Sequence, residues 1–304
     1  PNVKLYSLPS NSGQSAARNL GLRKAIGEYV YFQDIDDTIA TNSLKTLYAV
    51  AKQTDCDFVC TDFKRIENSE NQRNGTYNYS SDMVFGNNEL INAMQRELHD
   101  PSLGHLGLFG CNGRLIKRSI IIDNNIFFEE KLRWLEDKTF CWGVLSFVRS
   151  ARYIRKQLYS YYVYPNAKTA ITESLNRGFS LEYIKLIVSH IKNSLKQRGV
   201  SREEIEKLSQ QGLIFFSIHL LVSISRSMVL GKTDFVEAKK NRRDIINEIL
   251  NDSEILSAIK NYLPSKEESP WIPKAIAWRS RIFLEFACNR RAKEVIRMRR
   301  GGKV

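Results

Sequence analysis

NSGQSAARNLGLRKAIGEYVYFQDIDDT, residues 11–38, is the stretch that decides the fold class of this chain. Asn11-Ser12-Gly13 has the chemistry of a turn, and the Ala- and Leu-containing segment after it is typical of a helix that stops at Gly27. The next residues, EYVYF (28–32), are β-branched and aromatic, which predicts a buried strand. A turn, a helix and a strand in this order indicate an α/β fold.

Three carboxylates, Asp34, Asp36 and Asp37, follow directly at the end of this strand. Open α/β sheets bind their ligands at the carboxyl ends of the strands. Clustered acids repel one another unless a cation or a substrate proton offsets their charge. The cluster therefore predicts a ligand site, and a solvated acidic turn is the alternative that the triplet alone leaves open.

In this register the chain resembles the family 2 nucleotide-sugar glycosyltransferases of the GT-A fold. The matching pattern is Asn-x-Gly-x-Ser-x-Ala-Arg-Asn-x-Gly from residue 11, then Gly-Glu-Tyr at 27–29 and Asp-x-Asp-Asp at 34–37. It resumes with NGRLIKR at 112–118 and reaches WLED at 134–137, which is similar to the family's Glu-Asp element. The resemblance implies an α/β domain with a GT-A-like, Rossmann-like mixed sheet flanked by helices over residues 1–172.

The pattern becomes helical from about residue 173. Helices are predicted over residues 181–198, 202–229, 235–250, 253–263 and 273–298, separated by Gly199, Gly231 and Pro264. We therefore expect an all-helical C-terminal domain over residues 173–304. Its longest apolar run, 213–222, is shorter than the about 20 residues that span a bilayer, and is interpreted as a buried helix.

The resemblance implies a metal-dependent, inverting transfer of a sugar from a nucleotide-sugar donor, expected to be UDP-linked, to a hydroxyl acceptor. Mn²⁺ or Mg²⁺ would offset the charge that builds on the leaving diphosphate. Asp36 is the predicted metal ligand, with Asp34 as the second metal-site carboxylate, orienting the ribose or the metal's waters.

Further residues are assigned by the same resemblance. Asn11 and Gly13 in the turn are predicted to bind the donor. Arg18 is expected to pair with the phosphates or to brace the acidic loop, with a helix-surface arginine as the alternative. Lys168 would supply positive charge beside the diphosphate, or else is a solvated loop lysine.

The predicted catalytic base is Asp137, with Glu136 beside it at the start of an expected helix. A carboxylate at a helix N-terminus is expected to stay ionised, because the free N–H groups favour the anion. Such a group can accept the proton of the attacking hydroxyl. The alternative is that the pair only caps the helix.

Two other interpretations remain open. Residues 34–38, DIDDT, also fit the Asp-x-Asp-x-Thr of haloacid-dehalogenase-like phosphatases, in which Asp34 would be the nucleophile and Asp36 the general acid. That family usually has Gly in place of Asp37, and this chain contains no Gly-Asp dipeptide. Since the chain opens at an expected strand, residues 3–8, without the family's first two β/α units, it is alternatively a truncated, inactive GT-A remnant that serves as a binding module.

Charge is distributed unevenly along the chain. Residues 171–304 carry 25 Lys and Arg against 15 Asp and Glu, a net charge of +10, whereas residues 1–170 carry 21 against 18, a net charge of +3. The last predicted helix and the two residues after it hold Arg290, Arg291, Lys293, Arg297, Arg299 and Arg300, interleaved with Trp278, Phe283, Leu284 and Phe286. This pattern predicts peripheral contact with an anionic membrane, with a solvated basic face as the alternative.

The expected partners are therefore the nucleotide-sugar donor and a glycan or lipid-linked acceptor. No nucleic-acid-binding motif accompanies the positive charge. The five cysteines have no metal-site spacing and are interpreted as reduced thiols of a cytoplasmic protein. Bacterial surface polysaccharide synthesis (capsule, lipopolysaccharide or exopolysaccharide), at the inner face of the plasma membrane, is the expected role.

Overall fold

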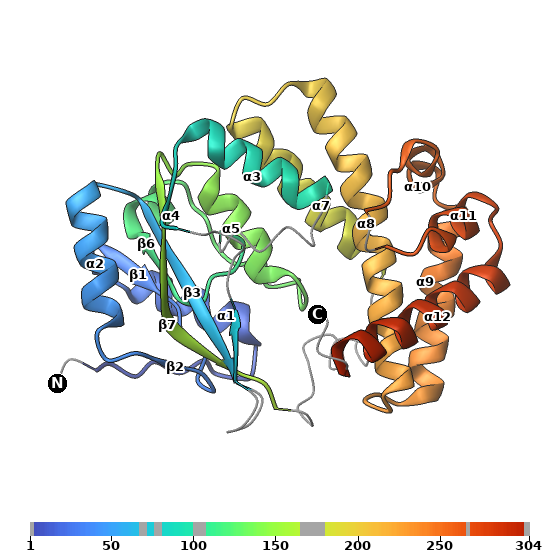
Figure 1. Ribbon diagram of the computed structural model, residues 1–304, viewed down its shortest axis with the longest axis horizontal. Coiled ribbons are helices and arrows are strands. Elements are labelled where there is room, and N and C mark those ends of the chain that lie inside the picture. The colour runs from blue at the N-terminus through green and yellow to red at the C-terminus, as the bar shows by residue number, and fades with distance from the viewer. Residues whose placement is uncertain are drawn as a thin grey trace. The chain divides into compact units, whose positions relative to one another are not determined.

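The computed structural model describes residues 3–66, 72–75, 81–99, 108–164, 180–265 and 268–300. The chain forms two compact units (Figure 1). The first comprises residues 1–97, 103–167 and 193–200, and the second comprises residues 98–102, 168–192 and 201–304. The predicted domain boundary after residue 172 lies outside the described residues.

The first unit is built on a seven-stranded mixed sheet in the order β1-β6-β3-β7-β2, with β4 beside β3 and β5 beside β7. Its strands are β1 (Tyr29–Tyr31), β2 (Thr38–Ile39), β3 (Phe58–Ile66), β4 (Gln72–Gly75), β5 (Met83–Phe85), β6 (Arg114–Lys117) and β7 (Ala151–Tyr162). β3 and β7 pair in parallel, and the other neighbouring strands pair antiparallel.

Helices flank this sheet, as the sequence predicted: α1 (Gln14–Lys24), α2 (Ser43–Thr54), α3 (Asn87–His99), α4 (Arg118–Asp123) and α5 (Glu136–Leu145). α2 places Leu47 and Ala51 in one core cluster with Val59 of β3 and Leu115 of β6. Figure 1 shows α2 and α5 on opposite sides of the strands. Both faces of the sheet are therefore covered, as a sheet with parallel pairing requires.

An aromatic cluster fixes the end of β1 against α5. The ring of Phe32, the residue after β1, lies 5.3 Å from that of Phe128 and 5.5 Å from that of Phe140 on α5, in edge-on contacts. Phe128 and Phe140 stack on each other with centroids 4.0 Å apart. Such pairs contribute about 0.5–1.5 kcal/mol each beyond the area they bury. The cluster therefore holds the acidic segment 34–37 close to the start of α5.

One strand prediction was wrong. Residues 3–8 form no strand, and Val3 and Leu5 are 84% and 91% exposed. Apolar alternation shows which side chains could face a core, but it does not show whether a partner strand is available. Residues 151–162 form one long strand, β7, which continues through a register shift against β3.

The second unit consists of α7 (Leu181–Gln197, which the first unit shares at its end), α8 (Arg202–Val229), α9 (Phe235–Asn251), α10 (Ser253–Ala258), the 3-10 turn η1 (Ile259–Asn261), α11 (Trp271–Ala277) and α12 (Arg281–Arg300). Its central helix, α8, is the one described helix that is long and apolar enough to cross a membrane, and 67% of its apolar window is buried in the structure. A buried core helix passes the same test, so the finding fits the predicted buried helix.

The predicted helix 273–298 is broken in two. α11 ends at Ala277, and Arg279 adopts a left-handed conformation with φ of 51°. The N–H of Ser280 then donates to the carbonyl of Ala275 (3.0 Å), which closes the end of α11 before α12 begins. Apolar periodicity continues across the break, so no pattern in the sequence marks it.

Candidate active site

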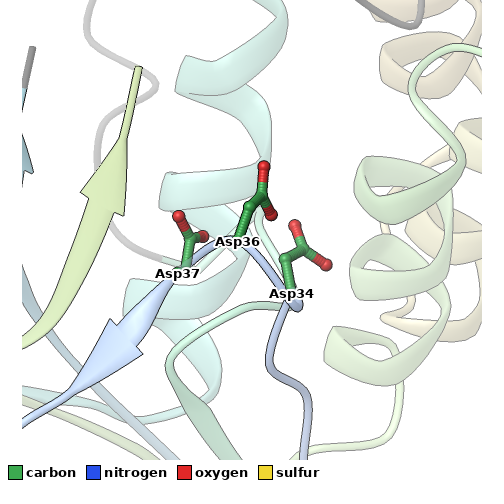
Figure 2. Close-up of side chains that lie close together, drawn as sticks. All are labelled: Asp34, Asp36 and Asp37. Carbon is green, nitrogen blue, oxygen red and sulfur yellow. The ribbon is translucent and has the colours of Figure 1, made fainter. Parts of the chain in front are cut away.

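The acidic segment 34–37 is a tight turn at the end of β1. The N–H of Asp37 donates to the carbonyl of Asp34 (3.2 Å), so Ile35 and Asp36 occupy the two corners of the turn. Both corner residues are exposed, and Asp37 returns to the interior. Figure 2 shows the three carboxylates around this turn. One oxygen from each lies within 4.8 Å of the others, so the turn concentrates negative charge.

Asp34 is held by three side-chain donors. Its Oδ1 accepts from Arg18 Nη2 (2.8 Å) and from Gln14 Nε2 (3.1 Å), both on α1, and its Oδ2 accepts from Asn112 Nδ2 (2.5 Å). Charge-assisted bonds of this kind are about twice as strong as neutral ones. The carboxylate of Asp34 is therefore fixed in position before any ligand binds.

Asn112 reaches Asp34 because of the backbone just before the start of β6. Phe32 and Asn112 form a β-bridge, and the N–H of Gly113 donates to the carbonyl of Phe32 (3.3 Å). Gly113 has φ of 71°, and a Cβ there would lie 3.1 Å from the ring of Tyr159. Glycine at 113 is thus needed to place Asn112 against the turn.

Arg18 joins the acidic turn to the start of α5. Its Nη2 binds Asp34, its Nη1 lies 3.6 Å from Glu136 Oε1, and its guanidinium carbon lies 5.2 Å from the centre of the Phe128 ring. The side chain is 11% exposed, and Nη1 has no hydrogen-bond partner among the described residues. The two predicted motifs, about 100 residues apart in sequence, therefore share one cation.

Asp37 has a different role from Asp34. Tyr159 Oη donates to its Oδ2 (2.5 Å) and the N–H of Tyr162 donates to its Oδ1 (3.0 Å). Asp37 is 4% exposed, and burial raises its pKa while the two hydrogen bonds oppose that rise. Asp37 therefore ties the turn to β7 and offers little to a ligand.

Asp36 is the carboxylate that remains available. It is exposed, and no hydrogen bond or ion pair joins it to another described residue. A hard divalent cation takes oxygen ligands and often keeps several waters, so one free carboxylate beside substrate phosphates suits it. Asp34 lies close enough to Asp36 to share a cation with it, but the oxygens of Asp34 already accept three hydrogen bonds.

Glu136 and Asp137 open α5 directly after a strained residue, Leu135, whose φ of 60° is left-handed. For a non-glycine residue such a conformation costs on the order of 1–3 kcal/mol, and strain of this kind gathers at functional sites. Asp137 Oδ1 accepts from the N–H of Lys138 (2.7 Å), a free amide of the first helical turn. The side chain of Asp137 thus accepts a hydrogen bond from the first turn of α5 and lies next to Glu136 in the chain.

Burial works against the expectation that Asp137 stays ionised. Burial raises the pKa of Asp137, although its hydrogen bond with Lys138 and the charge of Arg18 oppose the rise. Burial, and next the charge of Asp137, raise the pKa of Glu136 to about 7. Helix N–H groups stabilise the anion, but loss of hydration outweighs them here. A pair that takes up a proton near neutral pH suits acid–base chemistry.

A buried ion pair between Lys138 and Glu97 stabilises the start of α5. Lys138 Nζ contacts Glu97 Oε1, and the Glu97 side chain is only 1% exposed. Burial raises the pKa of Glu97, and the charge of Lys138 opposes that rise. Because Lys138 also donates its backbone N–H to Asp137, Glu97 fixes the residue that orients this carboxylate.

The remaining predicted residues lie in or beyond the first turn. Asn11 Oδ1 accepts from the N–H of Gly13 (3.2 Å), so Asn11 stabilises the turn itself. Gly13 has φ of 89° and ψ of 173°, a backbone conformation that is essentially confined to glycine. Lys168 lies outside the described residues. The sequence pattern assigned no role to Gln14, Asn112 or Tyr159, although Gln14 and Asn112 lie in segments that carried the resemblance.

Comparison with known proteins places these motifs in a family. A sequence model of glycosyl transferase family 2 matches residues 1–151. The cholesterol galactosyltransferase of Borreliella burgdorferi is 24% identical over 202 residues, 66% of this chain and 54% of that protein. The poly(ribitol-phosphate) beta-N-acetylglucosaminyltransferase TarP of Staphylococcus aureus is 27% identical over 188 residues, 61% of this chain and 52% of that protein. The chain spans about half the length of these relatives.

Solved structures agree with the fold. The crystal structure of S. aureus TarS 1-349 in complex with UDP-GlcNAc matches with a TM-score of 0.61 at 17% identity, over 98% of this chain and 76% of that one. This likeness confirms the GT-A-like fold. The family match spans both 34–37 and 136–137, and so favours the glycosyltransferase interpretation of the acidic motif over the phosphatase one.

Substitutions of the neighbouring residues Asp36 and Asp37 should differ in their effect on the free energy of unfolding. Asp37→Ala leaves the buried Tyr159 hydroxyl without an acceptor and should lower the free energy of unfolding by about 1–3 kcal/mol. Asp36→Ala removes an exposed side chain and should change it by less than about 0.5 kcal/mol. Urea unfolding followed by circular dichroism measures both. Equal losses in the two variants would contradict the division of roles.

Glu136 should make stability depend on pH. Its pKa is raised from 4.5 to about 7 on folding, so its ionisation opposes folding. The destabilisation is absent below pH 4.5, grows as pH rises from 4.5 to about 7, and is complete above that. Glu136→Gln should therefore unfold at higher urea than the wild type at pH 8 and at similar urea at pH 4.5. The exposed Asp123→Asn variant is the control, and an equal shift at both pH values would refute the assignment.

Proposed function

Because the chain belongs, through residues 1–151, to glycosyl transferase family 2, we propose that it transfers a sugar from a nucleotide-sugar donor to a hydroxyl group. The observation that carries this proposal is the shared ion pairing of Arg18 with Asp34 and Glu136. This pairing brings the acidic turn 34–37 and the buried carboxyl groups of Glu136 and Asp137 together at the carboxyl end of β1, where sheets of this kind bind ligands. A sugar transfer needs both parts, one for the leaving group and one for the acceptor.

The donor is proposed to be UDP-linked. Support comes from S. aureus TarS, which shares the fold and whose crystal structures include complexes with UDP-GlcNAc and UDP. In this chain the buried Nη1 of Arg18 has no hydrogen-bond partner among the described residues. A guanidinium nitrogen of this kind can donate to a phosphate oxygen. Arg18 is therefore proposed to contact the diphosphate while it holds the acidic turn.

The oxygen-rich turn fits a divalent cation such as Mn²⁺ or Mg²⁺. Asp36 would hold the ion, because it is exposed and no described residue engages its carboxylate. The ion, when bound, offsets the charge that develops on the diphosphate leaving group. Asp34, fixed by Arg18 and Asn112, would orient the ion's waters or the ribose.

Asp137 is proposed as the base of an inverting, single displacement. The acceptor oxygen forms a bond to the anomeric carbon as the bond from that carbon to the diphosphate oxygen breaks. The acceptor proton passes to Asp137, whose orientation is set by the N–H of Lys138. The charge of Asp137 raises the pKa of the neighbouring Glu136, since two close carboxylates do not both ionise easily.

The acceptor is proposed to be a glycan or a lipid-linked glycan of a bacterial surface polymer. The names of relatives support this class: TarP is a poly(ribitol-phosphate) beta-N-acetylglucosaminyltransferase, and GgaB of Bacillus subtilis is a minor teichoic acid biosynthesis protein. The proposed location is the cytoplasmic side of the plasma membrane, where the protein would meet a lipid-linked acceptor as a peripheral protein.

Asp36→Asn should remove the metal-dependent part of UDP binding. The neutral amide is a weaker ligand for a hard cation, so UDP affinity should become nearly equal with Mn²⁺ and with EDTA. Isothermal titration calorimetry measures both affinities, and Asp123→Asn should keep the wild-type difference. Unchanged metal-linked affinity in a folded Asp36→Asn protein would remove Asp36 from the metal site.

Asp137→Asn should reduce turnover rather than donor binding. The amide can still accept from the Lys138 N–H, so the free energy of unfolding should fall by no more than about 1–2 kcal/mol. Loss of the base should lower UDP release during transfer by roughly 10²–10⁴-fold, with UDP affinity unchanged. Near-normal turnover in the folded variant would return Asp137 to a structural role.

A further inference from the structure

The helical unit exposes a group of large apolar side chains where α11 meets α12. Trp271 is 41% exposed, Trp278 64%, Ile282 79% and Phe286 61%. The rings of Trp271 and Trp278 both lie against Phe283, with centroids 6.1 Å and 5.6 Å apart. Phe286 follows Ile282 by four residues and Phe283 by three, so each of the five side chains neighbours at least one other. We call these five side chains the aromatic platform.

The exposed face of α12 continues the platform with positive charge. Ile282, Phe286, Arg290, Lys293 and Arg297 are exposed and follow one another at helical spacings of three and four residues. The opposite face carries Leu284, Ala287, Cys288 and Ala292, which are at most 2% exposed and pack into the unit. Leu284, which the sequence suggested for membrane contact, is thus buried, and Ile282 takes its place.

Much of this positive charge is not neutralised by the protein itself. Among the described residues Arg281, Lys293 and Arg297 have no acidic partner, whereas Arg290 pairs with Glu294 (3.0 Å). Lys274 Nζ lies 4.9 Å from the centre of the Trp271 ring, so a cation also borders the other end of the platform. The platform is therefore an apolar surface bordered by cations on two sides.

A second copy of this chain fits the surface poorly. The exposed fractions correspond to on the order of 500 Å² of apolar area, since one aromatic side chain offers about 150–250 Å². That is the size of a functional patch on a monomer and is below the about 800 Å² per partner of a stable interface. A symmetric pairing would also bring the same unpaired cations of both copies together, and like charges repel.

We propose that the aromatic platform and the basic stripe of α12, which consists of Arg290, Lys293 and Arg297, form a docking surface for the headgroup region of an anionic lipid bilayer. Tryptophan, phenylalanine and isoleucine enter the boundary between headgroups and acyl chains, and Arg and Lys bind the anionic headgroups. The inference rests on the proposed peripheral location, and it identifies the membrane-facing part as the junction of α11 and α12 rather than the basic end of α12 alone.

Vesicle sedimentation tests the surface directly, using vesicles of phosphatidylcholine with and without about one third phosphatidylglycerol. The wild type should bind the anionic vesicles and release them as salt rises. Arg290→Gln/Lys293→Gln/Arg297→Gln should weaken this binding by roughly 100-fold, or about 5-fold per charge. Trp278→Ser/Ile282→Ser/Phe286→Ser should weaken it by at least roughly 10-fold. The matched control, Phe235→Ser/Val236→Ser, removes exposed apolar residues at the start of α9 (57% and 77% exposed) and should bind as the wild type does.

Tryptophan fluorescence gives a second readout that does not depend on multiple substitutions. Anionic vesicles should shift the emission to shorter wavelength, and Trp278→Phe should reduce the shift, because Trp134 and Trp142 are already buried (7% and 0% exposed). The proposal is overturned if the wild type ignores anionic vesicles, or if the platform variant binds them as the wild type does. It is also overturned if that variant instead abolishes self-association in sedimentation equilibrium. UDP affinity is measured separately and reports only on the proposed transferase site. A failure of UDP binding can therefore be told apart from a failure of vesicle binding.

Discussion

The site depends on one buried cation, the guanidinium of Arg18. It binds Asp34, approaches Glu136 and lies against the ring of Phe128, so it joins α1, the acidic turn and the start of α5. A buried charge is tolerated only when it is paired, and each of its acidic partners is likewise partly buried. Removing Arg18 would leave carboxylates close together without compensation. Electrostatic attraction to Arg18, and not packing alone, therefore determines the position of the turn relative to α5.

Carboxylates of the same chemistry take different roles because their surroundings differ. Asp34 is held by three donors, Asp36 faces solvent and Asp37 is bonded inside the sheet. The turn produces this difference, since its hydrogen bond from Asp37 to Asp34 leaves the corner residue outward. Glu136 and Asp137 lie in a drier place, where burial raises both pKa values. One part of the site thus presents carboxylates to a ligand, and the other part holds a buried acid pair that suits proton transfer.

The sequence predicted most elements, and its errors have physical causes. The prediction of a helix over 202–229 is confirmed by α8, whose start is set by the Ser201 side chain accepting from the N–H of Glu204. The strand predicted over 3–8 is absent, because local pattern carries no information about a pairing partner. The helix predicted over 273–298 is broken at Arg279, since a left-handed residue without glycine leaves no mark in the pattern. That break decides where Trp278 and Ile282 are exposed.

The sequence by itself determined the order of turn, helix, strand and acidic motif in residues 11–38, since capping, periodicity and residue type act over a few neighbours. It also placed Glu136 and Asp137 at the start of a helix. Only the tertiary structure decided that Arg18 faces both motifs, that Asn112 and Tyr159 hold the turn, and that Asp36 alone of the three turn acids stays outward. Those facts come from the β1–β6 pairing, the packing of α5 on Phe32 and the bond from Tyr159 of β7. Such contacts join residues about 80 to 120 positions apart, and no local pattern encodes which distant group will be buried beside which.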